Sequence, residues 1–341
     1  MKNTVSIIIP CYNCEKTIAR CLDSIINNTY KYFDVICVND GSKDNTLKVL
    51  KEYSKKNKKI KVVDKKNGGA ADARNHGLKN ATGEFIMLID SDDYIGKTYI
   101  EEYIKTIVDD DLDMVLGGYT RMSDNLEVLQ KRHITDTDWN HYKLLSPWAR
   151  IVRRKVIDDN NIYFHDFIMG DDVHFCMNIL SKTDKVKAID NIEYYYVYNG
   201  LSLTSTTYQD FKIEQTPLLD AIMEEFKDKR TKTFHYFMNR YVVYYLTTYG
   251  KNVNPKFFVK ETNKLYNYLK ENNIKYVSPF SKTAKGEDGK VKLVVSLFHL
   301  LYKMKLIVLF AKIYCKNKGK KRNEKSNWFI CTWKIMYYGW T

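Results

Sequence analysis

Short apolar runs alternate with helix-like segments through the first part of the chain. Four runs predict buried strands, since each is rich in aliphatic or β-branched residues and ends in a polar loop: residues 4–9, 33–39, 60–64 and 85–89. The segments between them carry apolar residues at helical spacing: Ile18, Cys21, Leu22, Ile25 and Ile26 in the first, and Leu47, Leu50 and Tyr53 in the second. A helix-like stretch, 70–79, precedes the fourth strand. This alternation predicts βαβ crossovers, and therefore an α/β fold with a mainly parallel sheet covered on both faces.

The pattern changes after residue 113. Further strands are expected over 113–119, 126–132 and 193–198, with a strand-to-helix unit over 146–157 and a helix from about 170. From about residue 208 the chain becomes helical and rich in tyrosine. We therefore expect two regions, an α/β domain over 1–205 and a helical C-terminal region over 206–341.

Each of the four predicted strands ends in a distinctive polar loop: 10–15, 39–44, 65–74 and 90–94. In open sheets of this kind, ligands bind at the carboxyl ends of the strands. Solvated turns would explain the Gly and Asn residues of these loops, but not the carboxylates that stand directly at the strand ends. The four loops together predict one composite site.

The densest of these loops is Asp90-Ser91-Asp92-Asp93. Carboxylates two residues apart beside a strand end can approach one hard cation, and Mg²⁺ and Mn²⁺ prefer such oxygen ligands while keeping water or phosphate as the rest. An EF-hand is excluded because Tyr94 and Ile95 stand where it needs an oxygen ligand and a glycine. The cluster predicts a divalent metal that carries a nucleotide diphosphate, and Asp93 is expected only to cap the next segment.

Composition adds a positive charge. Lys and Arg outnumber Asp and Glu by 55 to 41, a formal charge of +14, which favours an anionic partner. The segment 291–314 is strongly apolar but is interrupted by Lys303 and Lys305, and a basic run follows at 316–325. Three interpretations stay open: docking on an anionic membrane surface by residues 291–325, a helix buried in the fold, or a spanning helix.

Seven cysteines, an odd number, and no apparent signal sequence favour free thiols in a reducing cytoplasm. The pair Cys11 and Cys14 has the spacing of half a zinc site or of a redox motif. The chain has no second C-x-x-C and no H-x-x-x-H, and Pro10 and Asn13 indicate a loop rather than the helix start of a redox protein. We interpret both cysteines as small residues of that loop.

The ordered segments VSIIIPCYNCEKTIARCLDSI, VICVNDGSKDNT and NGGAADARNHGLKNATGEFIMLIDSDDY resemble the nucleotide-sugar domain of inverting family 2 glycosyltransferases. SPWARIVRRKVI and IYFHDFIMGDDVHF resemble the acceptor side of the same family, as found in bacterial cell-envelope polysaccharide synthesis. The resemblance implies a GT-A fold, a donor that is most often a UDP-sugar, a glycan or lipid-linked acceptor, and a place at the inner face of the cell membrane.

The resemblance also implies roles for single residues. The nucleotide-sugar side comprises Pro10, Tyr12, Asn13, Glu15, Asp40, Asn67, Arg74, Asp90, Ser91 and Asp92. Asp40 would meet the uracil, and Asp92, with Asp90 nearer the ribose, would hold Mn²⁺ or Mg²⁺. Asp172 is implied as the catalytic base, with Trp148 and Asp171 on the acceptor side.

Two positions depart from the family pattern. Asp171 stands where Glu is common, which leaves open which of Asp171 and Asp172 points into the site, and Arg150 stands where Lys is more usual. The competing hypothesis is a basic nucleotide- or nucleic-acid-binding protein of the membrane surface without transferase activity. No nucleic-acid motif supports it, and unfilled acidic loops would repel phosphate, so we expect no nucleic-acid partner.

Overall fold

The computed structural model describes residues 3–198 and 214–315, which form two compact units. The sheet unit comprises residues 3–136, 144–198 and 220–226, and the helical unit comprises residues 137–143, 214–219 and 227–315. The boundary predicted at residues 205 and 206 lies outside the described ranges.

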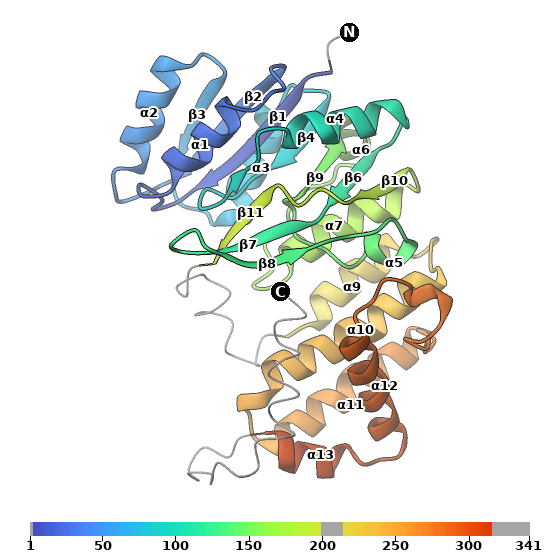
Figure 1. The fold of residues 1–341 in the computed structure, drawn as a ribbon. Helices are drawn as coiled ribbons and strands as arrows, with labels where there is room; N and C mark the ends of the chain where they lie inside the picture. Colours follow the sequence, from blue (N-terminus) through green and yellow to red (C-terminus); the bar gives the residue numbers. More distant parts are fainter. Residues whose placement is uncertain (1–2, 199–213, 316–341) are drawn as a thin grey trace. The chain divides into compact units, whose positions relative to one another are not determined.

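The sheet unit contains a seven-stranded sheet of order β10-β6-β9-β4-β1-β2-β3 (Figure 1). Its strands are β1 (Val5–Cys11), β2 (Phe33–Asp40), β3 (Ile60–Lys65), β4 (Phe85–Leu88), β6 (Met114–Gly117), β9 (Arg150–Arg153) and β10 (Val186–Ile189). All run parallel except β9, which is antiparallel to β4 and β6. The four predicted strands are therefore β1 to β4, and the predicted mainly parallel α/β fold is confirmed.

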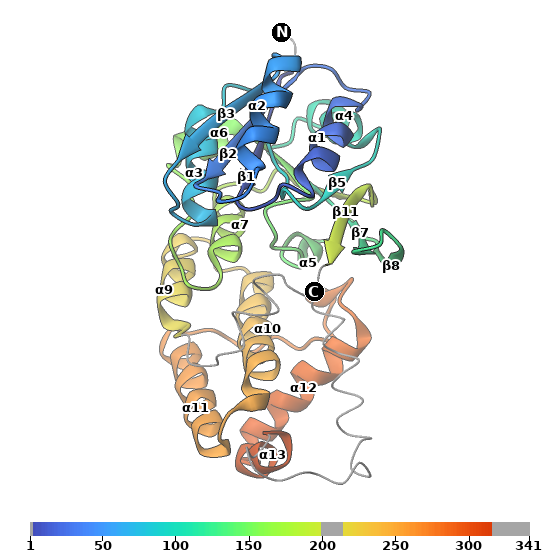
Figure 2. The same cartoon turned by 90° about the vertical axis from the view of Figure 1, so that its left-hand side faces the viewer.

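Helices cover both faces of this sheet. They are α1 (Ile18–Ile26), α2 (Thr46–Lys56), α3 (Ala70–Asn80), α4 (Tyr99–Asp109), α6 (Arg154–Asp159) and α7 (Asp171–Lys182). Figure 2 shows α1 and α4 on one side of the sheet and α3 and α6 on the other. Because successive side chains of a strand point to opposite faces, Ile7 and Ile8 of β1 face different helical layers, and both are fully buried.

A second sheet of order β5-β11-β7-β8 stands beside the first and comprises β5 (Tyr94–Ile95), β7 (Tyr119–Ser123), β8 (Val128–Arg132) and β11 (Tyr194–Tyr198). The single strand predicted over 113–119 is wrong, because the chain leaves β6 at Gly117 and enters β7 two residues later. A Cβ on Gly118 would lie 2.0 Å from the carbonyl oxygen of Arg132, and one on Gly117 would lie 2.0 Å from the Tyr103 hydroxyl. Two glycines are needed here because the chain passes from one sheet to the other through crowded space.

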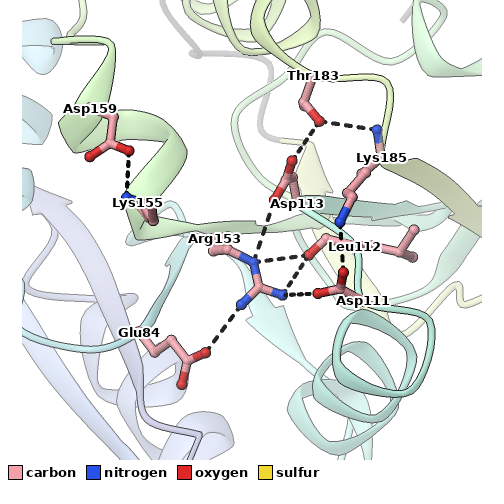
Figure 3. A network of polar contacts seen from close by, with 9 residues as sticks. All are labelled: Glu84, Asp111, Leu112, Asp113, Arg153, Lys155, Asp159, Thr183 and Lys185. Carbon is pink, nitrogen blue, oxygen red and sulfur yellow. Dashed lines mark hydrogen bonds and ion pairs between the residues drawn. The ribbon is translucent and has the colours of Figure 1, made fainter.

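Charged side chains join the strands at the amino edge of the large sheet, where β4, β6 and β10 begin (Figure 3). Arg153, the last residue of β9, donates to the carbonyl of Leu112 at 3.0 and 3.2 Å and reaches Glu84 at 3.2 Å. Its guanidinium also lies 3.4 Å from Asp113, whose other oxygen accepts from Thr183 at 2.6 Å. This network joins the end of β9 to the segments that begin β4, β6 and β10.

The helical unit contains α5 (Asp138–His141), α10 (Lys232–Tyr249), α11 (Pro255–Glu271), α12 (Gly289–Lys303), α13 (Ile307–Tyr314) and two short 3₁₀ turns, Gly250–Asn252 and Lys282–Ala284; α9 (Thr216–Glu225) begins in it and ends in the sheet unit. Thr231, Asn254 and Asp288 cap α10, α11 and α12 by accepting from backbone N–H groups of the first turn. Within the described part of the chain, no helix combines the length and apolar content that a bilayer span requires.

Candidate active site

The loops after β1 and β2 are hydrogen-bonded to each other at the carboxyl edge of the large sheet. The Asn13 side-chain oxygen accepts from Lys43 N–H at 2.8 Å, and Glu15 accepts from Asn45 N–H at 2.8 Å. Asn13 has a φ of 51°, in the left-handed region that asparagine tolerates better than most residues. Asn13 and Glu15, both predicted along the nucleotide, therefore brace the loop that contains them. Their partners are backbone groups of the neighbouring loop.

The other two residues predicted on this loop differ in accessibility. Tyr12 is 47% exposed and presents its ring at the loop surface. Pro10 is only partly accessible and is the residue before the last of strand β1. An exposed aromatic ring can stack on a nucleobase, since every base has an apolar face. The geometry leaves Tyr12 as the accessible aromatic group of this loop.

Asp40 ends β2 with a carboxylate that the protein itself binds. One oxygen pairs with the Lys65 ammonium and accepts from Gly68 N–H at 2.9 Å, and the other accepts from Gly69 N–H at 2.8 Å. The Asn67 amide donates to the Asp40 carbonyl oxygen at 2.9 Å. Asp40 and Asn67 thus lie together as predicted. With 4% of its side chain exposed, Asp40 would contact a base only by giving up one of these partners.

A cavity of about 480 Å³ lies beside the β3–α3 loop. Its lining includes Asn67, Gly68 and Asp72 from that loop and helix, and Phe164 and Asp166 from the segment that precedes α7. This volume is within the range of small-molecule sites. The cavity brings a donor-side residue, Asn67, next to the segment that resembles the family's acceptor side.

The Asp90-Ser91-Asp92 segment follows β4, and its two carboxylates have different surroundings. Asp90 accepts from Arg74 at 3.2 Å. Asp92 makes no ion pair with any residue in the described ranges, and the Arg20 guanidinium donates only to its carbonyl oxygen, at 2.6 Å. Burial raises the pKa of Asp92 to about 6, and the charge of Asp90 adds to this shift. Asp92 therefore faces the site as a carboxylate without a neutralising side chain.

The sequence suggested that Asp93 caps the next segment, but in the structure it does not. It is fully buried and accepts from the Tyr194 hydroxyl at 2.7 Å and from Val197 N–H at 2.8 Å, while Thr98 stands at the N-cap of α4. Tyr194 in turn accepts a hydrogen bond from Asp90 N–H at 3.3 Å. The third aspartate thus attaches the Asp90–Asp92 segment to β11, a strand about 100 residues further along the chain.

Asp171 and Asp172 form the first turn of α7. The preceding Gly170 has a φ of 98°, a conformation that glycine adopts without strain, and it turns the chain into the helix. Carboxylates in a first turn are stabilised by the helix dipole and by free N–H groups. This position places two acidic groups at the start of one helix, aimed toward the loops after β3 and β4.

Arg74 joins these carboxylates to Asp90. Its guanidinium lies 2.9 Å from Asp172, 3.4 Å from Asp171 and 3.2 Å from Asp90, and it also packs over the Phe164 ring. The Arg74 side chain is 8% exposed. The structure therefore brings the predicted base, its neighbour and one predicted metal ligand around a single buried cation.

Burial raises the pKa of Asp172 above its ordinary value. Arg74 opposes this shift, the charges of Asp171 and Asp90 add to it, and Arg150 opposes it. The Asp172 side chain is still 36% exposed, whereas that of Asp171 is 20% exposed. Asp172 is therefore the more accessible of the two and the closer to Arg74, which favours it as the group that meets an acceptor.

Trp148 lies in the core of the small sheet. It is 8% exposed and stacks on Tyr194 and Tyr196, with ring centroids 4.7 and 5.5 Å apart. Arg150 is buried as well, and its guanidinium donates to the Leu144 carbonyl oxygen. Trp148 thus supports the strand that carries Tyr194, and little of its surface is left to touch a sugar.

Sequence reasoning missed three residues of the site. Lys65 pairs with Asp40 and, at 2.6 Å, with Asp72; Arg20 holds the Asp92 backbone; and Tyr194 holds Asp93. Lys65 directly follows the strand predicted over 60–64 and opens the predicted loop 65–74, so its place beside the Asp40 loop was accessible to inference. Arg20 and Tyr194 gave no comparable signal, because a helix face and a tyrosine-rich strand are also ordinary features of a core.

The cysteines in the described ranges are all buried and free. Hydrogen bonds from Cys11, Ser91 and Thr46 lower the pKa of the Cys14 thiol, although burial opposes them. Cys11 and Cys14 both belong to the core beside β1. This agrees with their interpretation as small residues that pack the loop.

The donor set fits a hard divalent cation. Within the described residues no group of three or more His, Cys, Asp and Glu side chains could hold a metal by itself. Mg²⁺ and Mn²⁺ commonly take only one or two protein carboxylates and complete their shell with water and phosphate. The unneutralised carboxylate of Asp92 is the residue that such an ion would suit, with Asp90 beside it.

Comparisons with known proteins agree with this architecture. Residues 6–171 match the model for glycosyl transferase family 2. An uncharacterized glycosyltransferase of Bacillus subtilis, EpsJ, is 31% identical over 220 residues, which are 60% of this chain and 64% of EpsJ. A poly(ribitol-phosphate) beta-glucosyltransferase of Bacillus spizizenii is 29% identical over 74% of this chain and 42% of its own length. The chain thus spans less than two thirds of these relatives.

Among solved structures, S. aureus TarS 1-349 in complex with UDP-GlcNAc superposes with a TM-score of 0.56 at 21% identity, covering 82% of this chain and 95% of that one. At this identity the likeness concerns the fold. The fold and the acidic strand-end site define a GT-A glycosyltransferase domain. Residues 6–171, the segment that the family model matches, are assigned to glycosyl transferase family 2.

Proposed function

We propose that this protein transfers a sugar, with inversion, from a nucleotide-diphosphate sugar to a hydroxyl group of a glycan or lipid-linked acceptor. The donor is a UDP-sugar, and the product belongs to a cell-envelope polysaccharide. The observation that carries the proposal is the convergence of Asp90, Asp171 and Asp172 around Arg74 at the carboxyl edge of the sheet, with the unpaired Asp92 two residues after Asp90. The TarS complex with UDP-GlcNAc and the poly(ribitol-phosphate) relative support the donor and the acceptor class.

Donor binding uses the loops after the first four strands. Tyr12 offers its exposed ring to the base, and Asn67 borders the cavity at the β3–α3 loop. Asn13, Glu15 and Asp40 keep these loops in register through the backbone bonds described above, so the pocket is formed before the nucleotide arrives. Pre-formed loops reduce the ordering cost of binding.

Asp92, with Asp90, would hold Mn²⁺ or Mg²⁺. Such an ion supplies charge stabilisation for the departing diphosphate without proton transfer. Ser91 stands between them, and the Arg20 bond to the Asp92 carbonyl oxygen fixes the backbone of this segment.

Asp172 is the base. A positioned carboxylate takes the proton of the acceptor hydroxyl as that oxygen attacks the anomeric carbon, and direct attack from the face opposite the diphosphate inverts the configuration. One base suffices, because no covalent intermediate is needed. Arg74 keeps Asp172 oriented and, by its charge, favours the ionised form that can accept a proton.

We also place the protein in the cytoplasm at the inner face of the cell membrane. The formal charge of +14 and the buried, free cysteines of the described residues support this location. We keep the division of the chain into a GT-A domain over 1–205 and a helical C-terminal region over 206–341 as part of this proposal.

Metal-dependent UDP binding tests the proposal without knowledge of the acceptor. In calorimetry or thermal shift, UDP with Mn²⁺ or Mg²⁺ should bind at least about tenfold more tightly than UDP with EDTA. Asp92→Asn should lose most of that difference, whereas Glu127→Gln, at an exposed carboxylate of the β7–β8 turn, should keep it. A panel of UDP-sugars in the same assay would then identify the donor.

Two outcomes would count against this function. UDP affinity that does not respond to EDTA would remove the metal from the proposal. Tight binding of tRNA or DNA without any response to UDP would instead support the nucleic-acid hypothesis.

A further inference from the structure

Helix α12 carries apolar side chains on two different faces. Val291, Val294, Val295 and Phe298 are buried against the helical unit. A second row, at steps of four, three and four residues, is exposed: Leu293 is 62%, Leu297 41%, Leu300 50% and Met304 57% accessible. Residues at this spacing share one side of a helix. The second row is therefore an apolar face that the described fold does not cover.

Helix α13 repeats the arrangement after a short turn. Ile307, Phe310 and Ala311 are buried, whereas Val308 and Leu309 are 49% and 58% exposed, with Ile313 at 49% and Leu306 of the turn at 37%. Single exposed apolar residues are ordinary, but seven large apolar side chains on two consecutive helices and the turn between them are not. We call these residues the α12–α13 apolar face: Leu293, Leu297, Leu300, Met304, Leu306, Val308 and Leu309.

The charges around this face have one sign. The segment 289–314 contains Lys290, Lys292, Lys303, Lys305 and Lys312 and no Asp or Glu. None of these lysines forms an ion pair with a carboxylate in the described ranges. Lys303 and Lys305 flank the exposed Met304 in the turn that joins the two helices. Long lysine side chains can place their stems along apolar surface while their ammonium groups reach outward.

A second copy of the chain is a poor occupant for this face. A two-fold contact would bring the same surface of both copies together, and five lysines on each side would then meet without a carboxylate from residues 289–314 to pair with them. A spanning segment is no better, since no described helix is long and apolar enough. An apolar row bordered by cations matches the acyl and headgroup layers of an anionic bilayer.

We propose that the α12–α13 apolar face docks in the plane of an anionic lipid surface, with Leu293, Leu297, Leu300, Leu309 and their neighbours among the acyl chains and the five lysines among the headgroups. This inference names the surface that would hold the protein at the membrane. It does not depend on the transfer chemistry, because the contact involves no residue of the candidate active site.

Vesicle flotation with the full chain tests the proposal in the absence of any donor sugar. We expect binding to vesicles of equal parts phosphatidylglycerol and phosphatidylcholine, and at least about tenfold weaker binding to pure phosphatidylcholine. The double variant Leu297→Glu, Leu309→Glu should lose at least about tenfold in affinity for the anionic vesicles. Because both side chains are exposed, the substitutions should leave folding intact.

A matched control lies on β8. Leu129 is 53% exposed but stands in the sheet unit, so Leu129→Glu should bind vesicles like the unmodified protein. Lys303→Gln with Lys305→Gln should weaken binding to the anionic vesicles by about tenfold and should lessen its sensitivity to salt.

Three results would overturn the proposal. The first is that the unmodified chain does not float with anionic vesicles. The second is that the Leu297→Glu, Leu309→Glu variant binds these vesicles as well as Leu129→Glu does. The third is a dimer that forms without lipid and is disrupted by the same double variant, which would assign the face to a second copy. UDP binding measured on the same variants should stay unchanged, so failure of the docking surface can be distinguished from failure of the transferase proposal.

Discussion

The two edges of the large sheet use charge in opposite ways. At the amino edge, Arg153 and Lys185 meet Glu84, Asp111 and Asp113 in a network whose members are partly open to solvent, Asp111 at 78% (Figure 3). At the carboxyl edge, the single buried cation Arg74 meets Asp90, Asp171 and Asp172, and Asp92 stands beside them without an ion-pair partner in the described chain.

The difference in burial and charge balance between the two edges indicates which edge can gain free energy by binding a ligand. Exposed ion pairs contribute little to the free energy of folding, since water already solvates both partners. The charges at the amino edge therefore leave little energy for binding a ligand. Partly buried carboxylates in excess of their cations carry an unfavourable energy that a divalent metal or a proton can relieve. The carboxyl edge therefore carries an excess of negative charge, and under the proposed function this excess is the physical basis for metal binding there.

Loss of the base should have the largest effect on this edge. Asp172→Asn removes the proton acceptor but keeps the side chain's shape and a polar contact for Arg74. Hydrolysis of the preferred UDP-sugar, in which water replaces the acceptor, should fall by about 10²- to 10⁴-fold. UDP affinity with metal should stay within about threefold of the unmodified protein, which calorimetry would check.

Asp171→Asn is the matched control, because Asp171 is the adjacent residue and also contacts Arg74. Its hydrolysis rate should fall much less. Near-normal hydrolysis by Asp172→Asn together with a large loss in Asp171→Asn would reverse the assignment of the base.

Removal of the Arg74 guanidinium should have the second-largest effect, and this effect is on stability. Arg74→Gln leaves Asp90, Asp171 and Asp172 facing one another without their common partner. We expect the free energy of unfolding in urea to fall by about 2–4 kcal/mol, somewhat below the usual cost of breaking a buried pair, because Asp171 and Asp172 keep some solvent contact. Circular dichroism of urea titrations would measure the change.

Arg153→Gln is the corresponding change at the amino edge. Its partners are more exposed, so the loss there should be about 1 kcal/mol. Equal losses at the two edges would contradict the contrast between a buried, unbalanced edge and a solvated one.

The pH dependence should show a smaller effect with a definite sign. Burial raises the pKa of Asp172, with Asp171 and Asp90 adding to the shift and Arg74 and Arg150 opposing it. The base must be ionised, so hydrolysis at saturating metal should fall up to tenfold per pH unit once pH drops below that raised pKa, and this begins above the ordinary value of about 4.

The contribution of Asp172 to stability should change with pH in the direction opposite to the hydrolysis rate. Between the raised pKa and the ordinary one, the folded protein binds the Asp172 proton more tightly than the unfolded chain does, so this contribution to unfolding free energy increases as pH falls. The residual activity of Asp172→Asn should lack the inflection in hydrolysis. An identical inflection in that variant would show that another group causes it.

Much of the sheet unit could be predicted from local sequence. The four apolar runs became β1 to β4, and the loops predicted to share one edge do meet there, since parallel strands place their carboxyl ends together. The strand over 113–119 was wrong because Gly117 and Gly118 permit a close passage between two sheets, and neither hydrophobicity nor spacing reveals such crowding.

The roles of the individual aspartates were harder to predict. Asp90, Asp92 and Asp93 look alike in sequence, yet Arg74 pairs with the first, the second faces the site unpaired, and Tyr194 and Val197 bind the third. Each of those partners is brought to the cluster by packing of a different element. A local pattern therefore indicates that carboxylates gather, but it does not indicate which of them the protein itself satisfies.

The sequence by itself determined the alternation of strands and helices, the acidic loop after the fourth strand and the one-signed charge of residues 289–314. Periodicity and composition are local properties, so they are visible before folding. Only the tertiary structure decided that Arg74 joins the two acidic segments, that Asp93 is buried, and that the row through Leu297 is exposed while that through Val294 is not. Those outcomes depend on contacts between distant parts of the chain, because burial and pairing arise only when separate elements pack together.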